Sequence, residues 1–131
     1  MVFLVPTALV VEDDARSQKL ACTLLELRGF DVLTARTAAD AVRVAAESGP
    51  DVILMDIQLR GGDGEDGMSA LTKIRDNGKT AHIPVLAITA FAMKGDEERF
   101  LAHGFSGYVS KPIDAHTFVD VIASYLPPPE A

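Results

Sequence analysis

Five short runs of mainly apolar residues are the feature of this sequence that most restricts its fold. The runs occupy residues 7–11, 32–35, 51–56, 85–89 and 107–110. They have the length of strands, and their apolar residues are nearly continuous instead of alternating with polar ones. Continuous apolar runs of this length are typical of strands buried on both faces, as in a parallel sheet covered by helices.

Apolar residues at helical spacing separate these runs. The predicted helices cover residues 15–28, 38–48, 68–77, 94–103 and 118–125. In the first of them, Leu20, Leu24 and Leu27 recur at the spacing of one helix face. Thr37 is predicted to cap the second. Five strands that alternate with five helices predict an α/β fold with a doubly wound parallel sheet.

The length and composition of the chain limit the classes of protein to which it can belong. With 131 residues, of which 48% are hydrophobic, the chain is predicted to form one domain. Its core is expected over about residues 6–126, with a Pro-rich tail at 127–131. Lys and Arg number 12 against 19 Asp and Glu, which gives a net charge of −7. This charge has the wrong sign for contacts with nucleic-acid phosphates, so we expect no nucleic-acid partner.

The sequence also carries no sign of a membrane or of an oxidising compartment. Its apolar opening lacks a basic leading segment and meets Pro6 early, and no run approaches the roughly 20 apolar residues of a membrane span. Cys22 is the only cysteine, which excludes an internal disulfide. We therefore expect a cytoplasmic protein with no membrane partner.

Polar residues that end the strands or directly follow them are the candidates for function, because ligands of doubly wound folds bind outside the carboxyl ends of the strands. These residues are Glu12, Asp13, Asp56, Thr89 and Lys111. Three carboxylates in one crevice repel one another unless a cation or a proton relieves them. Oxygen ligands of this kind suit Mg²⁺ better than zinc or copper. A Mg²⁺ site held by Glu12, Asp13 and Asp56 is therefore predicted.

A carboxylate can also act as a nucleophile toward phosphorus, provided that the charge on the transferred group is neutralised. Asp56 ends the central run and is the predicted nucleophile, which would form an aspartyl phosphate. The ammonium group of Lys111 and the hydroxyl group of Thr89 are predicted to meet the phosphoryl oxygens.

The same residues resemble the motifs of a known family. Glu12-Asp13, Asp56 at the end of LMD, Thr89-Ala90 and Lys111-Pro112 are together similar to the receiver domains of two-component response regulators. The resemblance covers about residues 6–126 and implies the flavodoxin-like (βα)5 fold with strand order 2-1-3-4-5. Within the family, the segments AHIPVLAITAFAMKGDEERF and GYVSKPI are most similar to single-domain regulators of cell division and polarity in alphaproteobacteria.

The resemblance implies a phosphorelay function. A histidine kinase or a histidine phosphotransfer protein would pass a phosphoryl group from its phosphohistidine to Asp56. The backbone carbonyl of Gln58 would be a further Mg²⁺ ligand, and the Lys111–Pro112 peptide bond would be cis. Apart from its own aspartyl phosphorylation and dephosphorylation, the chain is not expected to be an enzyme.

The resemblance also implies which residues change conformation after phosphorylation and which surface a partner recognises. Tyr108 matches the switch aromatic of receivers, whose ring is expected to turn inward as Thr89 moves toward the phosphoryl group. The expected output surface comprises residues 94–103, residues 107–110 and the last helix. A downstream protein partner is expected to bind there.

The sequence departs from the receiver pattern after Asp56. Receivers usually have Pro four residues after this Asp, where the chain has Arg60. The family's Asp-Gly pair falls on Asp66-Gly67, which makes the intervening loop longer than usual. An alternative function therefore stays open, namely a receiver-like protein-interaction module that is not controlled by phosphorylation.

Two other functions of similar folds are disfavoured by single positions. A phosphohydrolase of the haloacid-dehalogenase type would need a second Asp where Gln58 stands, because an amide cannot exchange protons as a general acid and base does. An FMN carrier would need a phosphate-binding loop where Glu12-Asp13 stands, and these acids would repel the phosphate.

Overall fold

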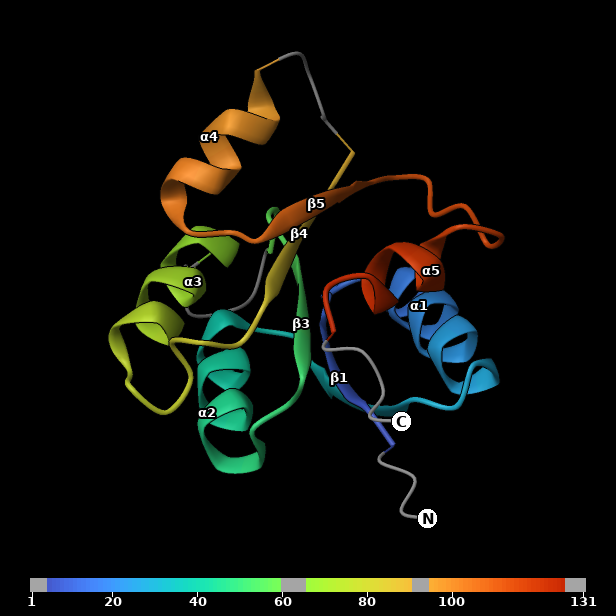
Figure 1. Ribbon diagram of the computed structural model, residues 1–131, viewed down its shortest axis with the longest axis horizontal. Helices are drawn as coiled ribbons and strands as arrows, with labels where there is room; N and C mark the ends of the chain where they lie inside the picture. The colour runs from blue at the N-terminus through green and yellow to red at the C-terminus, as the bar shows by residue number, and fades with distance from the viewer. Residues whose placement is uncertain (1–4, 60–65, 91–94, 127–131) are drawn as a thin grey trace.

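The computed structural model describes residues 5–59, 66–90 and 95–126, which form a parallel sheet with helices on both faces (Figure 1). The strands are β1 (Thr7–Val11), β2 (Asp31–Ala35), β3 (Val52–Asp56), β4 (Val85–Thr89) and β5 (Gly107–Ser110). The helices are α1 (Ala15–Leu27), α2 (Ala38–Ser48), α3 (Gly67–Asp76), α4 (Asp96–His103) and α5 (Phe118–Ala123). All neighbouring strands are parallel, in the order β2-β1-β3-β4-β5. The predicted doubly wound α/β fold and its strand order are confirmed.

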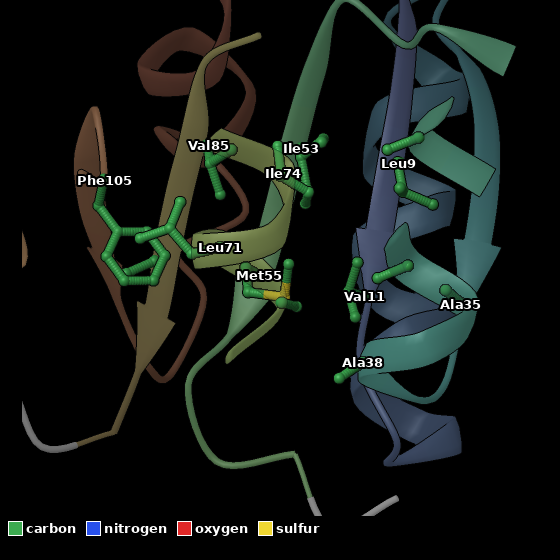
Figure 2. Close-up of a cluster of buried hydrophobic side chains, with 14 of the residues drawn as sticks. Leu9, Val11, Ala35, Ala38, Ile53, Met55, Leu71, Ile74, Val85 and Phe105 are labelled. Carbon is green, nitrogen blue, oxygen red and sulfur yellow. The ribbon is translucent and has the colours of Figure 1, made fainter. Parts of the chain in front are cut away.

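Side chains of the central strands alternate between two apolar layers, as the two-residue period of a strand requires. Ile53 and Met55 of β3 point into the layer beneath α2, α3 and α4, whereas Val52 and Leu54 point into the layer beneath α1 and α5. Figure 2 shows part of the first layer. Every residue of β3 and β4 is buried, which explains why these runs are nearly continuous in apolar residues.

Side-chain caps fix the starts of three helices. Asp14 accepts a hydrogen bond from the Ser17 backbone and begins α1, and Thr37 accepts one from the Asp40 backbone and begins α2. Asp66 accepts one from the backbone of Ser69 at the start of α3. Each cap satisfies a backbone donor that has no partner within its helix. The predicted cap at Thr37 is confirmed.

The buried face of α1 differs from the prediction. Leu20 is 44% exposed and Leu27 is 77% exposed, whereas Ala21 and Leu25 are buried against the sheet. Ala21 and Leu25 also have helical spacing, and the small side chain of Ala21 allows α1 to lie close to the sheet. The prediction that Leu20 and Leu27 belong to the core-facing stripe is wrong, and only Leu24 of that set packs against the core.

Several predicted features lie outside the described residues. These are Arg60 with most of the loop that follows it, the predicted helix start at residue 94, and the Pro-rich tail at 127–131. The last helix is shorter than predicted and ends at Ala123. Within the described ranges, no helix is both long enough and apolar enough to cross a membrane.

Candidate functional site

A cleft of about 380 Å³ lies at the carboxyl ends of β1 and β3. It is lined by Glu12, Asp13, Asp14, Asp56, Gln58 and Lys111. Because the strands are parallel, their carboxyl ends meet at one edge of the sheet, and residues far apart in the sequence come together there. Five of the predicted site residues line this cleft, and Asp14 joins them in addition to capping α1.

Three carboxylates converge in the cleft. Glu12, Asp13 and Asp56 each offer one oxygen atom, and these atoms lie within 4.8 Å of one another. Glu12 is only 3% exposed and Asp56 only 4%. Such a group is electrostatically costly in a buried setting and has the oxygen donors that a hard divalent cation needs.

Lys111 provides the positive charge that faces these carboxylates. Its Nζ atom lies 3.1 Å from Oε2 of Glu12 and 3.4 Å from Oδ2 of Asp56. The Lys111–Pro112 peptide bond is cis, as the family resemblance implies. The Lys111 backbone N–H donates to the carbonyl of Thr89 at 2.8 Å, so that Lys111 is tied to the buried end of β4.

The crowding of charge changes the proton affinity of two groups. Burial, together with the hydrogen bond and repulsion from Asp56, raises the pKa of Glu12 from 4.5 to about 7, despite the opposing effect of Lys111. Burial acts to lower the pKa of Lys111, but the hydrogen bonds and attraction of Glu12 and Asp56 outweigh it and raise that pKa. The cleft therefore favours extra positive charge, as a proton or as a cation.

Backbone donors orient the two buried carboxylates. The Gln58 backbone N–H donates to Oδ1 of Asp56 at 2.9 Å, and the Asp14 backbone N–H donates to Oε1 of Glu12 at 3.2 Å. The other oxygen of each carboxylate contacts Lys111. Both carboxylates are thus held by a donor on each oxygen, which limits their rotation.

Tyr108 lies away from the acidic cleft. It lines a second groove of about 360 Å³ between β5 and α5. Its ring centroid is 6.1 Å from that of Phe100 in α4, and it packs at the margin of the first apolar layer. The structure therefore places Tyr108 between α4 and α5, on the predicted output side of the sheet.

Two side chains beside the cleft contact its backbone and were not predicted from the sequence. The Gln18 amide nitrogen donates to the carbonyls of Glu12 and Ala35, at 3.2 Å and 3.4 Å. The Arg36 guanidinium donates to the carbonyl of Asp13 at 3.1 Å. Polar residues at such positions have no distinctive spacing, because these contacts depend on how the segment between β1 and α1 lies beside the end of β2.

Comparison with known proteins agrees with this arrangement. The family model of the response regulator receiver domain matches residues 8–123. Over 120 residues, 92% of this chain and 95% of the relative, the chain is 42% identical to the polar-differentiation response regulator DivK of Brucella ovis. This match confirms the narrower resemblance to single-domain regulators.

The chain is also similar to solved structures of receiver proteins. The receiver domain of the sensor histidine kinase PA1611 from Pseudomonas aeruginosa PAO1, with a magnesium ion coordinated in its active-site cleft, is 30% identical with a TM-score of 0.82. The match covers 93% of this chain and 98% of that one. The chemotaxis protein CheY4 of Vibrio cholerae shares the fold, with 21% identity, a TM-score of 0.86, and coverage of 94% of this chain and 100% of that one. The chain belongs to the response regulator receiver family.

Proposed function

We propose that this protein is a phosphorelay receiver in which Asp56 accepts a phosphoryl group from a phosphohistidine. The donor would be a histidine kinase or a histidine phosphotransfer protein. The observation that carries the proposal is the meeting of three carboxylates with Lys111 in one cleft, where Nζ of Lys111 is 3.4 Å from Asp56. A carboxylate nucleophile, a cation site and a fixed ammonium group are what aspartyl phosphorylation requires.

The donor set of the cleft fits Mg²⁺. We propose that the carboxylates of Glu12, Asp13 and Asp56 hold the ion together with the backbone carbonyl of Gln58. All of these ligands are oxygen atoms, which a hard divalent cation prefers, and the three carboxylates offer theirs within 4.8 Å of one another. The bound ion supplies neutralisation of the charge on the phosphoryl oxygens.

The residues of the cleft then perform the transfer. A carboxylate oxygen of Asp56 attacks phosphorus and forms the new P–O bond while the P–N bond of the phosphohistidine breaks, and the imidazole nitrogen keeps that electron pair. Lys111 pairs with a phosphoryl oxygen as its contact with Asp56 is replaced. The hydroxyl group of Thr89 donates to another oxygen from the end of β4.

The same proposal assigns the output to α4, β5 and α5. Thr89 and Lys111 are joined by a backbone hydrogen bond, so a shift of either one moves the start of the segment after β5. We propose that Tyr108 reports this shift, because its ring lies between Phe100 of α4 and the groove next to α5. A downstream protein partner would recognise the altered surface.

The protein would catalyse only its own phosphorylation and dephosphorylation. We place it in the cytoplasm, where its phosphoryl donors are made and where its free Cys22 stays reduced.

Mass spectrometry after incubation with Mg²⁺ and acetyl phosphate tests the proposal. Wild type should gain one phosphoryl group, and Asp56→Asn should gain none at this site. A parallel incubation with a phosphorylated histidine kinase tests the natural donor. An unmodified wild type with both donors would overturn the proposal and favour the interaction module that needs no phosphorylation.

A further inference from the structure

The backbone of the β1–α1 connection is held by a side chain that does not itself line the acidic cleft. The ladder between β1 and β2 ends at the pair Val11–Ala35. The Glu12 backbone N–H then donates to the Ala35 carbonyl at 3.0 Å. The side-chain amide of Gln18 lies beside this last bond and donates to the carbonyls of both Glu12 and Ala35.

The identity of the Gln18 atom that faces these carbonyls follows from their chemistry. Both neighbours are acceptors, so only the amide nitrogen, with its two protons, satisfies them. Gln18 is itself fixed, because its backbone N–H donates to the Asp14 carbonyl in the first turn of α1 at 2.9 Å. The side chain is half-buried. It therefore acts as a short brace between α1 and the ends of two strands.

The Gln18 brace contacts the stretch of backbone that carries two of the three carboxylates of the cleft. Glu12 is braced through its carbonyl by Gln18, and Asp13 through its carbonyl by Arg36. The carboxylates of Glu12 and Asp13 leave the same short stretch of backbone toward Asp56. A small rotation of this stretch would separate oxygen atoms that now lie within 4.8 Å of one another.

We propose that Gln18 is a positioning residue for the Mg²⁺ site. It touches neither the proposed ion nor the phosphoryl group, and it holds the Glu12 backbone so that the carboxylates of Glu12 and Asp13 converge with that of Asp56. The inference rests on the proposed Mg²⁺ binding. Residues that orient metal ligands from outside typically change metal affinity by about 10- to 100-fold when they are replaced.

Calorimetric titration with Mg²⁺ tests the inference without phosphorylation. Gln18→Met keeps the length of the side chain and removes its donors, and we expect it to weaken Mg²⁺ binding by about tenfold. Thr23→Met is the matched control, since Thr23 is an exposed residue of the same helix, and it should bind Mg²⁺ as wild type does. Urea unfolding should show that both variants are folded at the temperature of the titration.

A second variant separates positioning from charge. Gln18→Glu adds a negative charge near the cleft, which by electrostatics alone would tighten Mg²⁺ binding. It also places a carboxylate against two carbonyls and destroys the brace, so the positioning role requires weaker binding. In metal-free protein, the backbone amides of Glu12 and Asp13 should exchange with deuterium faster in both Gln18 variants than in Thr23→Met.

The outcomes distinguish this inference from the proposed function. If the wild-type protein does not bind Mg²⁺, both the role of Gln18 and the proposed Mg²⁺-dependent phosphorylation are overturned. A wild type that binds Mg²⁺, with unchanged binding in Gln18→Met or tighter binding in Gln18→Glu, would overturn only the role of Gln18. In acetyl phosphate assays, Gln18→Met should need about tenfold more Mg²⁺ for its half-maximal rate and approach the wild-type rate at saturation.

Discussion

The ammonium group of Lys111 lies closer to Glu12 than to Asp56, at 3.1 Å compared with 3.4 Å. Lys111 is therefore shared between the proposed nucleophile and a proposed metal ligand. Both carboxylates are buried, and because burial disfavours their charge, the positive charge of Lys111 stabilises them. A Mg²⁺ ion held by Glu12, Asp13 and Asp56 would supply further positive charge to the same carboxylates.

Replacement of Lys111 should make stability depend on Mg²⁺. In Lys111→Ala, Glu12 and Asp56 lose their partner, and we expect the free energy of unfolding without Mg²⁺ to fall by about 3 kcal/mol at pH 8. Urea unfolding with and without Mg²⁺ measures this effect, and saturating Mg²⁺ should restore most of the loss. Affinity for Mg²⁺ should not fall, whereas the surface change after phosphorylation should be lost.

A lysine outside the cleft is the control for this experiment. Lys79 is exposed, and Lys79→Ala should change the free energy of unfolding by less than about 0.5 kcal/mol, with no dependence on Mg²⁺. Equal losses of Mg²⁺ binding and of the surface change in Lys111→Ala would contradict the role that we assign to Lys111.

The raised pKa of Glu12 predicts that Mg²⁺ binding depends on pH near neutrality. Mg²⁺ requires the ionised carboxylate, and the pKa of Glu12 is about 7 in the metal-free protein. Affinity should therefore weaken by about tenfold from pH 8 to pH 6, and binding should release a proton. Calorimetry at both pH values, in buffers of different ionisation enthalpy, measures the two effects. Glu12→Gln should bind more weakly and lose the dependence.

The same shift sets the sign of a stability change in the metal-free protein. Between pH 4.5 and about 7, folded chains retain a proton on Glu12 that unfolded chains release. The contribution of Glu12 to stability is then complete below pH 4.5 and is lost as the pH rises through 7. Subtraction of the Glu12→Gln profile isolates this contribution, and a rise in the difference over this range would contradict the assignment.

The polar residues of the cleft could be predicted from the sequence because each lies at the end of an apolar run that has the length of a strand. Asp56 follows four apolar residues and Lys111 follows the last short strand, and parallel strands bring such ends to one edge. The distances within the cleft could not be predicted, nor could the sharing of Lys111 between two acids. These depend on side-chain rotamers and on the backbone donors of Asp14 and Gln58.

The buried face of α1 shows where periodicity alone is insufficient. Leu20 and Leu27 have the spacing of an apolar stripe, yet the helix turns Ala21 and Leu25 toward the sheet. A leucine stripe and an alanine-containing stripe can both satisfy the 3.6-residue period. The choice depends on how closely the helix must approach β1 and α5, which is a property of the assembled layers.

Gly67 should be intolerant of any side chain because it contacts the backbone of the proposed phosphoacceptor. A Cβ atom at Gly67 would lie 2.5 Å from the carbonyl oxygen of Asp56 and 3.1 Å from Cα of Ile57. Gly67→Ala must therefore displace either the start of α3 or the end of β3. We expect a loss of about 2 kcal/mol in the free energy of unfolding. We also expect slower phosphorylation by acetyl phosphate under conditions in which the variant is folded.

Gly78 provides the matched control. A Cβ atom there would have no neighbour within 4 Å, so Gly78→Ala should leave the phosphorylation rate unchanged. The two variants are compared by mass spectrometry at saturating Mg²⁺, with unfolding measured in parallel. Equal rates in the two alanine variants would show that the close approach of Gly67 to Asp56 does not matter for the reaction.

Phe100 should connect the stability of α4 with the environment of Tyr108. The Phe100 side chain is 4% exposed, and its ring centroid lies 5.9 Å from that of Phe105 and 6.1 Å from that of Tyr108. Phe100→Ala removes both ring contacts, and we expect it to lower the free energy of unfolding by about 3–4 kcal/mol. Near-ultraviolet circular dichroism should show a less ordered tyrosine signal.

Leu101→Ala is the control that distinguishes the loss of the Phe100 ring contacts from a general loss of stability in α4. Leu101 is 47% exposed, so Leu101→Ala should cost less than about 1 kcal/mol and leave the tyrosine signal unchanged. Because Phe100 packs on Tyr108 from α4, its loss should also reduce the difference between phosphorylated and unphosphorylated protein in the hydrogen exchange of α4 and β5. A full difference in Phe100→Ala would mean that Tyr108 responds to phosphorylation independently of α4.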